Sequence, residues 1–220
     1  MIFDWGYALS LLPLLAPALL ITLKATLAGM AIALVVGLML ALARRSRAKL
    51  VSRPAAAFVE FVRSTPLLVQ LYFLFYVLPG AGITLSPFAT GALALGLHYA
   101  AYCSEVYRAG IESVPQGQWE AASALNFNRR DTLMRIILPQ ALARVVPALG
   151  NYLVAMFKDT PLLSAITVVE LLQTAKMIGS ETFRYIEPLT LVGLLFLVLS
   201  LVSAFGLRAL EARVAQAVRT

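Results

Sequence analysis

The stretch SVPQGQWEAASALNFNRRDTLMRIILPQAL, residues 113–142, is a long polar segment between strongly apolar ones. Its first half is predicted to be a short helix that starts at Pro115, because the fixed φ of proline suits a first helical position. One apolar face of this helix is formed by Trp119, Ala122 and Leu125. Asn126 falls where the helix would end in the left-handed conformation, which asparagine tolerates. The first half therefore predicts an amphipathic helix with a defined end.

The second half of the stretch predicts another short helix. Asn128 suits the N-cap position, and Asp131 falls in the first turn, where a carboxylate interacts favourably with the helix dipole. Leu133, Ile136 and Ile137 give this helix an apolar face. Pro139 is expected to close or kink it. From pattern alone, the stretch is either a docking surface for another protein or an amphipathic loop lying on a membrane.

The composition places the rest of the chain in a membrane. Of its 220 residues 60% are hydrophobic and 13% are charged, whereas soluble domains carry about 25% charged residues. The net charge of +7 does not indicate nucleic-acid binding, because the charges cluster in loops beside apolar segments. A single cysteine and a single histidine exclude a disulfide framework and a cysteine- or histidine-rich metal site. No basic residue precedes the first apolar segment, so a cleaved signal peptide is not expected.

A helix needs about 20 residues to cross a bilayer core. Apolar segments of about this length predict an all-α membrane protein with five transmembrane helices: Leu19–Ala43, Ala55–Pro79, Pro87 to about Arg108, Val145–Leu172 and Leu189–Leu207. They divide the chain into an N-terminal periplasmic segment (1–18), a transmembrane domain (19–208) with a cytoplasmic loop (112–144), and a cytoplasmic tail (209–220).

Small residues recur every four positions in two of these segments: Ala25, Gly29, Ala33, Gly37 and Ala41 in the first, and Ala92, Gly96, Ala100 and Ser104 in the third. Such stripes predict closely packed helices. Most of the 18 Lys and Arg residues fall in the first connection, in the long loop and in the tail. By the positive-inside rule the N-terminus is expected outside and the C-terminus in the cytoplasm.

The stretch 113–142 resembles the cytoplasmic loop of the membrane subunits of binding-protein-dependent ABC importers. The family signature there is Glu-Ala-Ala, three residues, Gly, nine residues, and Ile-x-Leu-Pro. The chain fits every spacing with Glu120, Ala121, Ala122, Asn126, Ile136, Leu138 and Pro139. The one departure is Asn126 in place of glycine, and asparagine is the next-best residue for that turn. In this family the loop is the coupling helix that fits a groove on the ATPase subunit, which is the role the resemblance implies for these residues.

The resemblance covers nearly the whole chain and implies an ABC importer type I permease fold in a bacterial inner membrane. RSTPLLVQLYF, YCSEVYRAGIESVPQGQWEAA and PALGNYLVAMFKDT are similar to the polar amino-acid branch, whose members import histidine, glutamine or arginine. ALNF and LLQTAKMIGSETFRYIEP are similar to permeases for ectoine and hydroxyectoine. The implied partners are cytoplasmic ATPase subunits that bind ATP and Mg, a second permease subunit, and an extracytoplasmic solute-binding protein. The chain itself is expected to bind no cofactor.

RSTPLL at residues 63–68 and KDTPLL at residues 158–163 interrupt two apolar segments in the same way. Proline removes a helical hydrogen bond, and transporters use broken helices to face a solute. The predicted solute-pathway residues are Arg63, Ser64, Thr65, Pro66, Lys158, Asp159, Thr160 and Pro161, together with Tyr102 and Glu105 on the third segment. The alternatives are simple packing kinks, local pairing of Lys158 with Asp159, and snorkelling of Arg63 to the cytoplasmic surface.

Other polar residues of the apolar segments carry weaker predictions. Glu105 and Arg108, three residues apart, are expected to form a structural pair, and His98 to be hydrogen-bonded within the packing. Four more residues could meet the solute, its binding protein or only a neighbouring helix: Asn151, Tyr152, Glu170 and Gln173.

The sequence also separates classes of function. It has no phosphate-binding loop, and no Gly-Lys pair occurs, so ATP hydrolysis is expected to come from a partner. An intramembrane protease would need paired aspartates, a Ser-His dyad or a zinc site, and these are not found. A stand-alone channel or secondary transporter would leave the Glu-Ala-Ala loop without a role. The chain is therefore predicted to be a transporter subunit, for an ectoine-type solute or alternatively for a glutamine-, histidine- or arginine-type amino acid.

Overall fold

A computed structural model describes the backbone of residues 3–217 and the side chains of residues 3–209. The described residues form helices and no strands, in the following order: α1 (Trp5–Ser10), α2 (Leu12–Arg44), α3 (Lys49–Arg63), α4 (Leu67–Tyr72), the π-helical turn η1 (Phe73–Val77), the 3-10 turn η2 (Leu78–Ala81), α5 (Pro87–Glu112), α6 (Gln116–Ala124), α7 (Arg129–Asp131), the π-helical turn η3 (Thr132–Ile137), α8 (Leu138–Asp159), the 3-10 segment η4 (Thr160–Ile166), α9 (Leu171–Thr182) and α10 (Ile186–Ala217).

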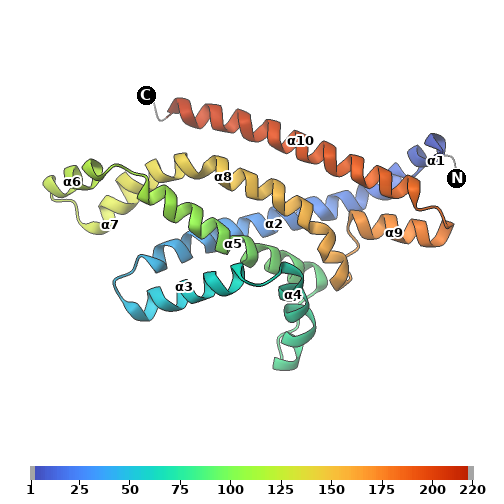
Figure 1. Cartoon of the computed structure of the whole chain (residues 1–220), viewed down its shortest axis with the longest axis horizontal. Coiled ribbons are helices and arrows are strands. Elements are labelled where there is room, and N and C mark those ends of the chain that lie inside the picture. The colour runs from blue at the N-terminus through green and yellow to red at the C-terminus, as the bar shows by residue number, and fades with distance from the viewer. Residues whose placement is uncertain (1–2, 218–220) are drawn as a thin grey trace.

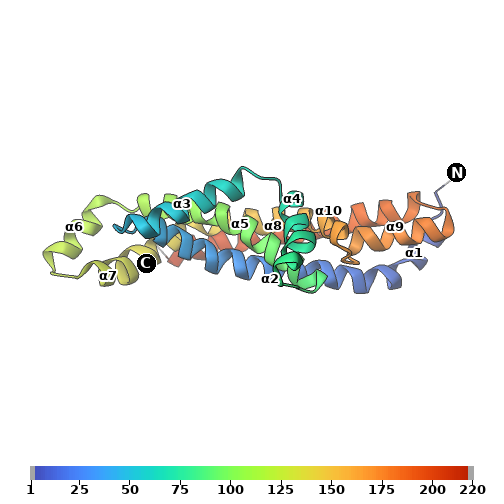
Figure 2. The ribbon, with the colours of Figure 1, turned by 90° about the horizontal axis from the view of Figure 1, so that it is seen from below.

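The long helices α2, α5, α8 and α10 run along the length of an elongated bundle (Figure 1). Seen from below, α6 and α7 lie at one end, and α1 and α9 lie at the opposite end beside the N-terminus (Figure 2). In Figure 1, α4 turns away from the line of α3 and projects from the bundle. This arrangement separates the loop at residues 113–142 from the two Thr-Pro breaks nearer the middle.

The α2–α5 pair forms the centre of the bundle, and its small residues make the close approach possible. A Cβ added at Gly37 would lie 2.7 Å from the Cβ of Cys103, and one added at Gly96 would lie 2.6 Å from side-chain atoms of Ile32. No side chain larger than hydrogen fits at such distances unless the helices separate. The predicted packing role of both small-residue stripes is confirmed.

Within the described residues, three helical runs are long and apolar enough to cross a membrane: residues 12–44, 129–166 and 186–209. A fourth is possible if α3 and α4, which are bent by 109° at residues 64–66, count as one broken span. The helix α5 is not among them, although it has 26 residues and a largely buried surface. The five-span count and the orientation therefore stay predictions.

Several helices begin or end at other residues than the predicted apolar segments. The first long helix begins at Leu12 rather than Leu19. The fourth predicted segment, expected to reach Leu172, ends at Ile166, because Thr167 adopts a left-handed conformation with φ 66°. Glu170 then caps α9, because its carboxylate accepts hydrogen bonds from the backbone N–H groups of Leu172 and Gln173. Glu170 is thus buried in a cap rather than placed at a free helix end.

The last helix, predicted to end at Leu207, continues to Ala217. The predicted tail therefore begins inside α10, and its residues 218–220 lie outside the described residues. The predicted N-terminal segment also holds helix, since α1 and the start of α2 fall within residues 1–18, of which residues 1–2 lie outside the described part.

The loop at residues 113–142 differs from prediction in three details. Pro115 is the N-cap of α6 and not its first helical residue. Leu125 does not share the buried face of Ala122, because its side chain is 71% exposed. Pro139 does not close the second helix: α7, η3 and α8 form one continuous helical run through it. The π-helical turn just before Pro139 provides the irregular hydrogen bonding that a proline in a helix requires.

Candidate functional site

The short helix α6 is held against the bundle by both of its flanks. The guanidinium of Arg144 on α8 donates to the backbone carbonyl of Ser113. The amide of Gln140 donates to the side chain of Gln118 at 3.1 Å. A buried apolar cluster lies beneath the loop, with Trp119 packed against it: Ile111, Val114, Ile137, Leu138 and Ala141. The loop is therefore a fixed part of the fold.

The turn that ends α6 has the predicted geometry. Asn126 has φ 55°, in the left-handed region, and the Asn128 side chain accepts a 2.8 Å hydrogen bond from the backbone N–H of Asp131. Both predictions are confirmed. This tight turn leaves Leu125 and Phe127 exposed at the tip of the loop.

The residues of the Glu-Ala-Ala signature divide into two groups. Glu120, Ala121, Asn126 and Pro139 are exposed. Ala122 and Leu138 are buried, and Ile136 packs partly against the cluster under the loop. The buried group fixes the loop, and the exposed group, with Leu125 and Phe127, presents a surface on which a partner could dock.

The first Thr-Pro break separates α3 from α4. Ser64 is the C-cap of α3, and Pro66 is the N-cap of α4 with an extended backbone. The Thr65 hydroxyl donates to the carbonyl of Phe61 at 2.9 Å. Gln70 reaches back across the break and donates to the carbonyls of Val62 (2.8 Å) and Thr65 (3.1 Å). Carbonyl groups freed by the break are thus satisfied within the chain, as a broken helix in lipid requires.

The second break ends α8 at Asp159 but does not interrupt the helical run, which η4 continues. Thr160 is fully buried, and its hydroxyl donates to the carbonyl of Phe157 at 2.7 Å. The Asp159 carboxylate accepts a 2.7 Å hydrogen bond from the Tyr99 hydroxyl on α5. Lys158 is exposed and forms no ion pair with any described side chain, so the alternative in which Lys158 pairs locally with Asp159 is not supported.

Aromatic rings on α5 connect the two breaks. Tyr102 lies 5.8 Å from Tyr152 and 6.3 Å from Tyr99, measured between ring centroids. The Arg63 guanidinium lies over the Tyr102 ring at 5.7 Å, while Tyr99 binds Asp159. Charged groups from both breaks thus meet one aromatic cluster, which is defined here as Tyr99, Tyr102, Tyr152 and His98.

His98 contributes to this cluster as predicted for a packed histidine. Its Nδ1 lies 3.1 Å from the Oε1 of Gln70, the residue that bridges the first break. The prediction that His98 is hydrogen-bonded within the packing is confirmed. The same contact ties α4 to α5 beside the aromatic cluster.

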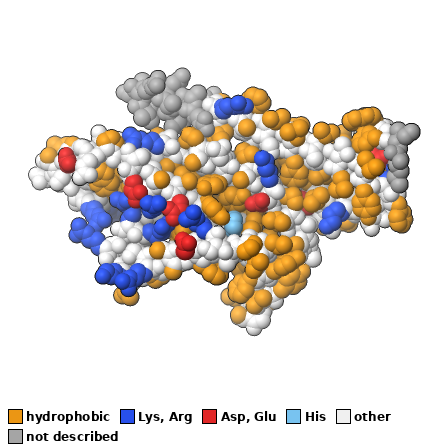
Figure 3. Space-filling model, in the orientation of Figure 1, with side chains coloured by type: hydrophobic (Ala, Val, Ile, Leu, Met, Phe, Trp, Pro, Cys, Tyr) orange, Lys and Arg blue, Asp and Glu red, His pale blue; other side chains and the backbone are white. Residues whose placement is uncertain are grey.

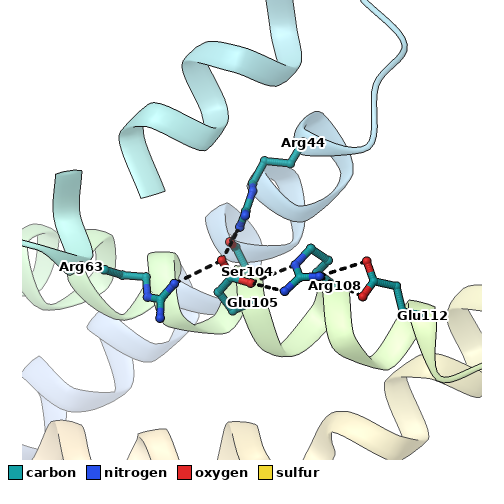
Figure 4. A network of polar contacts seen from close by, with 6 residues as sticks. All are labelled: Arg44, Arg63, Ser104, Glu105, Arg108 and Glu112. Carbon is teal, nitrogen blue, oxygen red and sulfur yellow. Dashed lines mark hydrogen bonds and ion pairs between the residues drawn. The ribbon is translucent and has the colours of Figure 1, made fainter. Parts of the chain in front are cut away.

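Glu105 lies at the centre of an ion-pair network (Figure 4). Its carboxylate contacts Arg44 at 2.8 Å, Arg63 at 3.2 Å and Arg108 at 2.9 Å. Arg108 also pairs with Glu112. The predicted Glu105–Arg108 pair is confirmed, but it is one part of a larger network that joins α2, α3 and α5. Charge-assisted hydrogen bonds of this kind are stronger than neutral ones.

Sequence reasoning missed three residues of this region. Gln70 was not singled out, although a glutamine four residues after a proline break is positioned to bond freed carbonyl groups. Tyr99 and Arg44 were not singled out either, because a tyrosine in an apolar segment and an arginine just after one are common in membrane proteins. No local signal could pair Arg44 with Glu105, which is 61 residues away.

Comparison with known proteins gives the class of the chain. The family model described as "Binding-protein-dependent transport system inner membrane component" matches residues 33–216. Because this match covers most of the chain, the chain belongs to that family of ABC importer membrane subunits. It is a transporter subunit rather than an enzyme, as the sequence predicted.

The relatives narrow the class further. The chain is 49% identical to the "Probable amino-acid ABC transporter permease protein y4tG" of Sinorhizobium fredii, over 94% of this chain and 90% of the relative. It is 35% identical to the "Glutamine transport system permease protein GlnP" of Escherichia coli K12, over 96% and 97%. A solved structure described as "Crystal structure of an amino acid ABC transporter with histidines" superposes with a TM-score of 0.90 at 34% identity, covering 97% of this chain and 100% of the other.

Proposed function

We propose that the chain is the membrane permease of an ATP-driven importer for a polar amino acid. Relatives named for amino acids and for glutamine, and the structure with histidines, support this solute class. They give no support to the ectoine and hydroxyectoine branch, so a proteinogenic polar amino acid replaces it as the proposed solute.

One observation supports the choice of solute. The first break places the cation Arg63 at the aromatic cluster, and the second break places the carboxylate of Asp159 there. Asp159 offers a carboxylate to an ammonium group, and Arg63, whose side chain is 39% exposed, offers free N–H groups to a carboxylate. A zwitterionic amino acid needs both partners. Ionisable residues within membrane segments are functional candidates by default, because they are expensive to bury there.

The proposed energy source is a separate ATPase that binds ATP and Mg. It would dock on the exposed part of the loop at residues 113–142, which is the coupling loop. Closure of two ATPase subunits would move the α6 helices of two permease subunits toward each other. Gln118 of α6 is bound to Gln140 of α8, and α8 is bound through Arg144 to Ser113 at the end of α5. This movement would therefore be transmitted to α5 and α8, which carry the aromatic cluster. An extracytoplasmic binding protein would deliver the solute.

The docking assignment is tested with Glu120→Lys in the complex reconstituted with its ATPase and binding protein. Glu120 is exposed, so the variant should insert and fold normally while solute-stimulated ATP hydrolysis is lost. Glu60→Lys, an equal charge change at an exposed position of α3, is the matched control. Equal ATPase stimulation in both variants would contradict docking at Glu120.

The solute is tested by measuring uptake and ATPase stimulation with glutamine, histidine, arginine, ectoine and hydroxyectoine in turn. Stimulation by at least one of the amino acids supports the proposal. Stimulation by ectoines alone would overturn the amino-acid assignment and leave the permease assignment intact.

A further inference from the structure

A groove of about 540 Å³ lies between the α2–α3 turn and the coupling loop. Its apolar lining comes from the last turn of α2, from α6 and from η3: Leu42, Trp119, Leu133 and Met134. Arginines from the same segments line it as well: Arg45, Arg47, Arg129 and Arg130. In Figure 3, Lys and Arg side chains gather at this end of the molecule, next to hydrophobic ones. The groove is therefore amphipathic, with cationic and apolar walls.

The charge of this groove is not compensated within the described part of the chain. None of its arginines forms an ion pair with a carboxylate among residues 3–209. Two carboxylates of the same segments are engaged elsewhere, Asp131 with Arg135 and Glu112 with Arg108, and Glu120 does not line the groove. The contact of the Arg45 guanidinium with the Trp119 ring, at 5.8 Å, orients a cation without neutralising it. An anion from outside the chain could therefore bind in the groove and neutralise its arginines.

The position of the groove indicates what kind of anion this is. Leu42 belongs to the last turn of α2, a helix long and apolar enough to span a membrane, so the groove opens where that helix would leave the lipid. Beside it, Leu50 is 92% exposed between the basic residues Arg47, Lys49 and Arg53. An exposed leucine among cations is typical of a membrane interface. An acidic protein surface would match the arginines but would leave Leu50 and the apolar wall without a partner.

We propose that this groove binds an anionic phospholipid, with the headgroup phosphate at the arginines and an acyl chain along Leu42, Leu133 and Met134. Basic pockets at the cytoplasmic ends of transmembrane helices bind such headgroups by the same combination of charge and apolar contact. The lipid would join the α2–α3 turn to α6 and η3, and so stabilise the position of the coupling loop. This inference does not depend on which solute is transported.

The chain offers a built-in reporter for the test. It has two tryptophans; Trp119 lines the groove, and Trp5 lies in α1 at the opposite end of the molecule. In the full-length Trp5→Phe variant in lipid nanodiscs, the remaining emission comes from Trp119. Phosphatidylglycerol with a brominated acyl chain, mixed into phosphatidylcholine, is expected to quench this emission at least about twofold more than an equal fraction of brominated phosphatidylcholine.

Removing two groove cations, with R129Q/R130Q, should weaken the preference for phosphatidylglycerol by about an order of magnitude. Both arginines are exposed, so the fold should persist. The matched control K176Q/R208Q removes two exposed cations outside the groove and should keep the preference. Equal quenching by the two brominated lipids in the parent protein, or equal loss in both double variants, would overturn the proposal.

The competing occupant is an acidic surface of the ATPase subunit, which a second arm of the experiment addresses. The ATPase is added to the nanodiscs, and tryptophan emission is recorded once with unbrominated and once with brominated phosphatidylglycerol. Tryptophans of the ATPase that lie far from lipid emit equally in both samples, so the difference between the two samples reports Trp119. A difference that persists supports the lipid. A difference that disappears on docking would assign the groove to the ATPase and refute the lipid site.

Discussion

The two Thr-Pro breaks share a sequence pattern but not a structure. At the first, α3 and α4 meet at 109° and the chain turns out of the bundle. At the second, α8 continues as η4 within one helical run. Among the positions that differ is the one four residues after the proline, which is Gln70 in the first break and Ala165 in the second. Gln70 satisfies the carbonyls that the sharp bend exposes, whereas Ala165 can bond none by its side chain.

The cations of the two breaks also differ. Arg63 is bound by Glu105 and held over Tyr102, whereas Lys158 forms no ion pair among the described side chains. Among the described residues, the carboxylate of Asp159 in the second break accepts one side-chain hydrogen bond, from the Tyr99 hydroxyl. The comparison teaches that Arg63 of the first break is oriented by Glu105 and Tyr102, whereas the charged side chains of the second break have fewer partners among the described residues.

The largest effect is expected from Asp159→Asn. The amide can still accept the Tyr99 hydrogen bond, but the negative charge offered to an ammonium group is lost. Hydrogen bonds to charged groups contribute about 1.5–3 kcal/mol, so solute uptake at low concentration should fall about 10- to 100-fold. Uptake kinetics in proteoliposomes measure this. Ser64→Ala, at the equivalent position of the first break, removes no charge and should retain uptake; an equal loss in both variants would mean that the charge of Asp159 is not what binds the solute.

Glu105→Gln should be next in effect. It leaves Arg44, Arg63 and Arg108 without their shared carboxylate, and the free energy of unfolding should fall by about 2 kcal/mol. The partial exposure of Glu105, with 21% of its side chain accessible, keeps the loss below that of a fully buried pair. Denaturant unfolding in detergent tests this, with Glu60→Gln as the control that should remain within about 0.5 kcal/mol of the parent. No difference between the two variants would show that the network does not hold the first break.

Gln70→Ala places an alanine four residues after the proline of the first break, as Ala165 does in the second break. The carbonyls of Val62 and Thr65 lose a donor, and the free energy of unfolding should fall by about 1.5 kcal/mol. Hydrogen exchange of residues 61–70 should accelerate while that of residues 157–166 does not change. Unchanged exchange at the first break would show that the bend does not depend on the glutamine bridge.

Ser164→Ala should have the smallest effect. The Ser164 hydroxyl donates to the carbonyl of Pro161 at 2.8 Å within η4, a single local hydrogen bond worth about 0.5–1 kcal/mol. The same unfolding measurement should place this variant closer to the parent than Gln70→Ala. The reverse order would mean that the second break, and not the first, relies on side-chain hydrogen bonds.

Features governed by local backbone preference could be predicted from the sequence. Asn126 in the left-handed region, the Asn128 N-cap and the close packing at Gly37 and Gly96 were all read from single residues or fixed spacings. Helix ends were less predictable. The helices extend beyond the apolar segments that indicated them, because hydropathy reports where lipid contact ends and not where helical hydrogen bonding ends.

By itself, the sequence determined a helical membrane protein with two Thr-Pro breaks and the coupling-loop signature of the importer family, because composition, proline and spacing act locally. Only the tertiary structure decided that one break interrupts its helix with a 109° bend, whereas the helical run continues through the other. It also decided that Glu105 gathers arginines from three helices and that Tyr99 holds Asp159. These pairings join residues about 40 to 60 positions apart, and their formation depends on how whole helices pack, which no local pattern encodes.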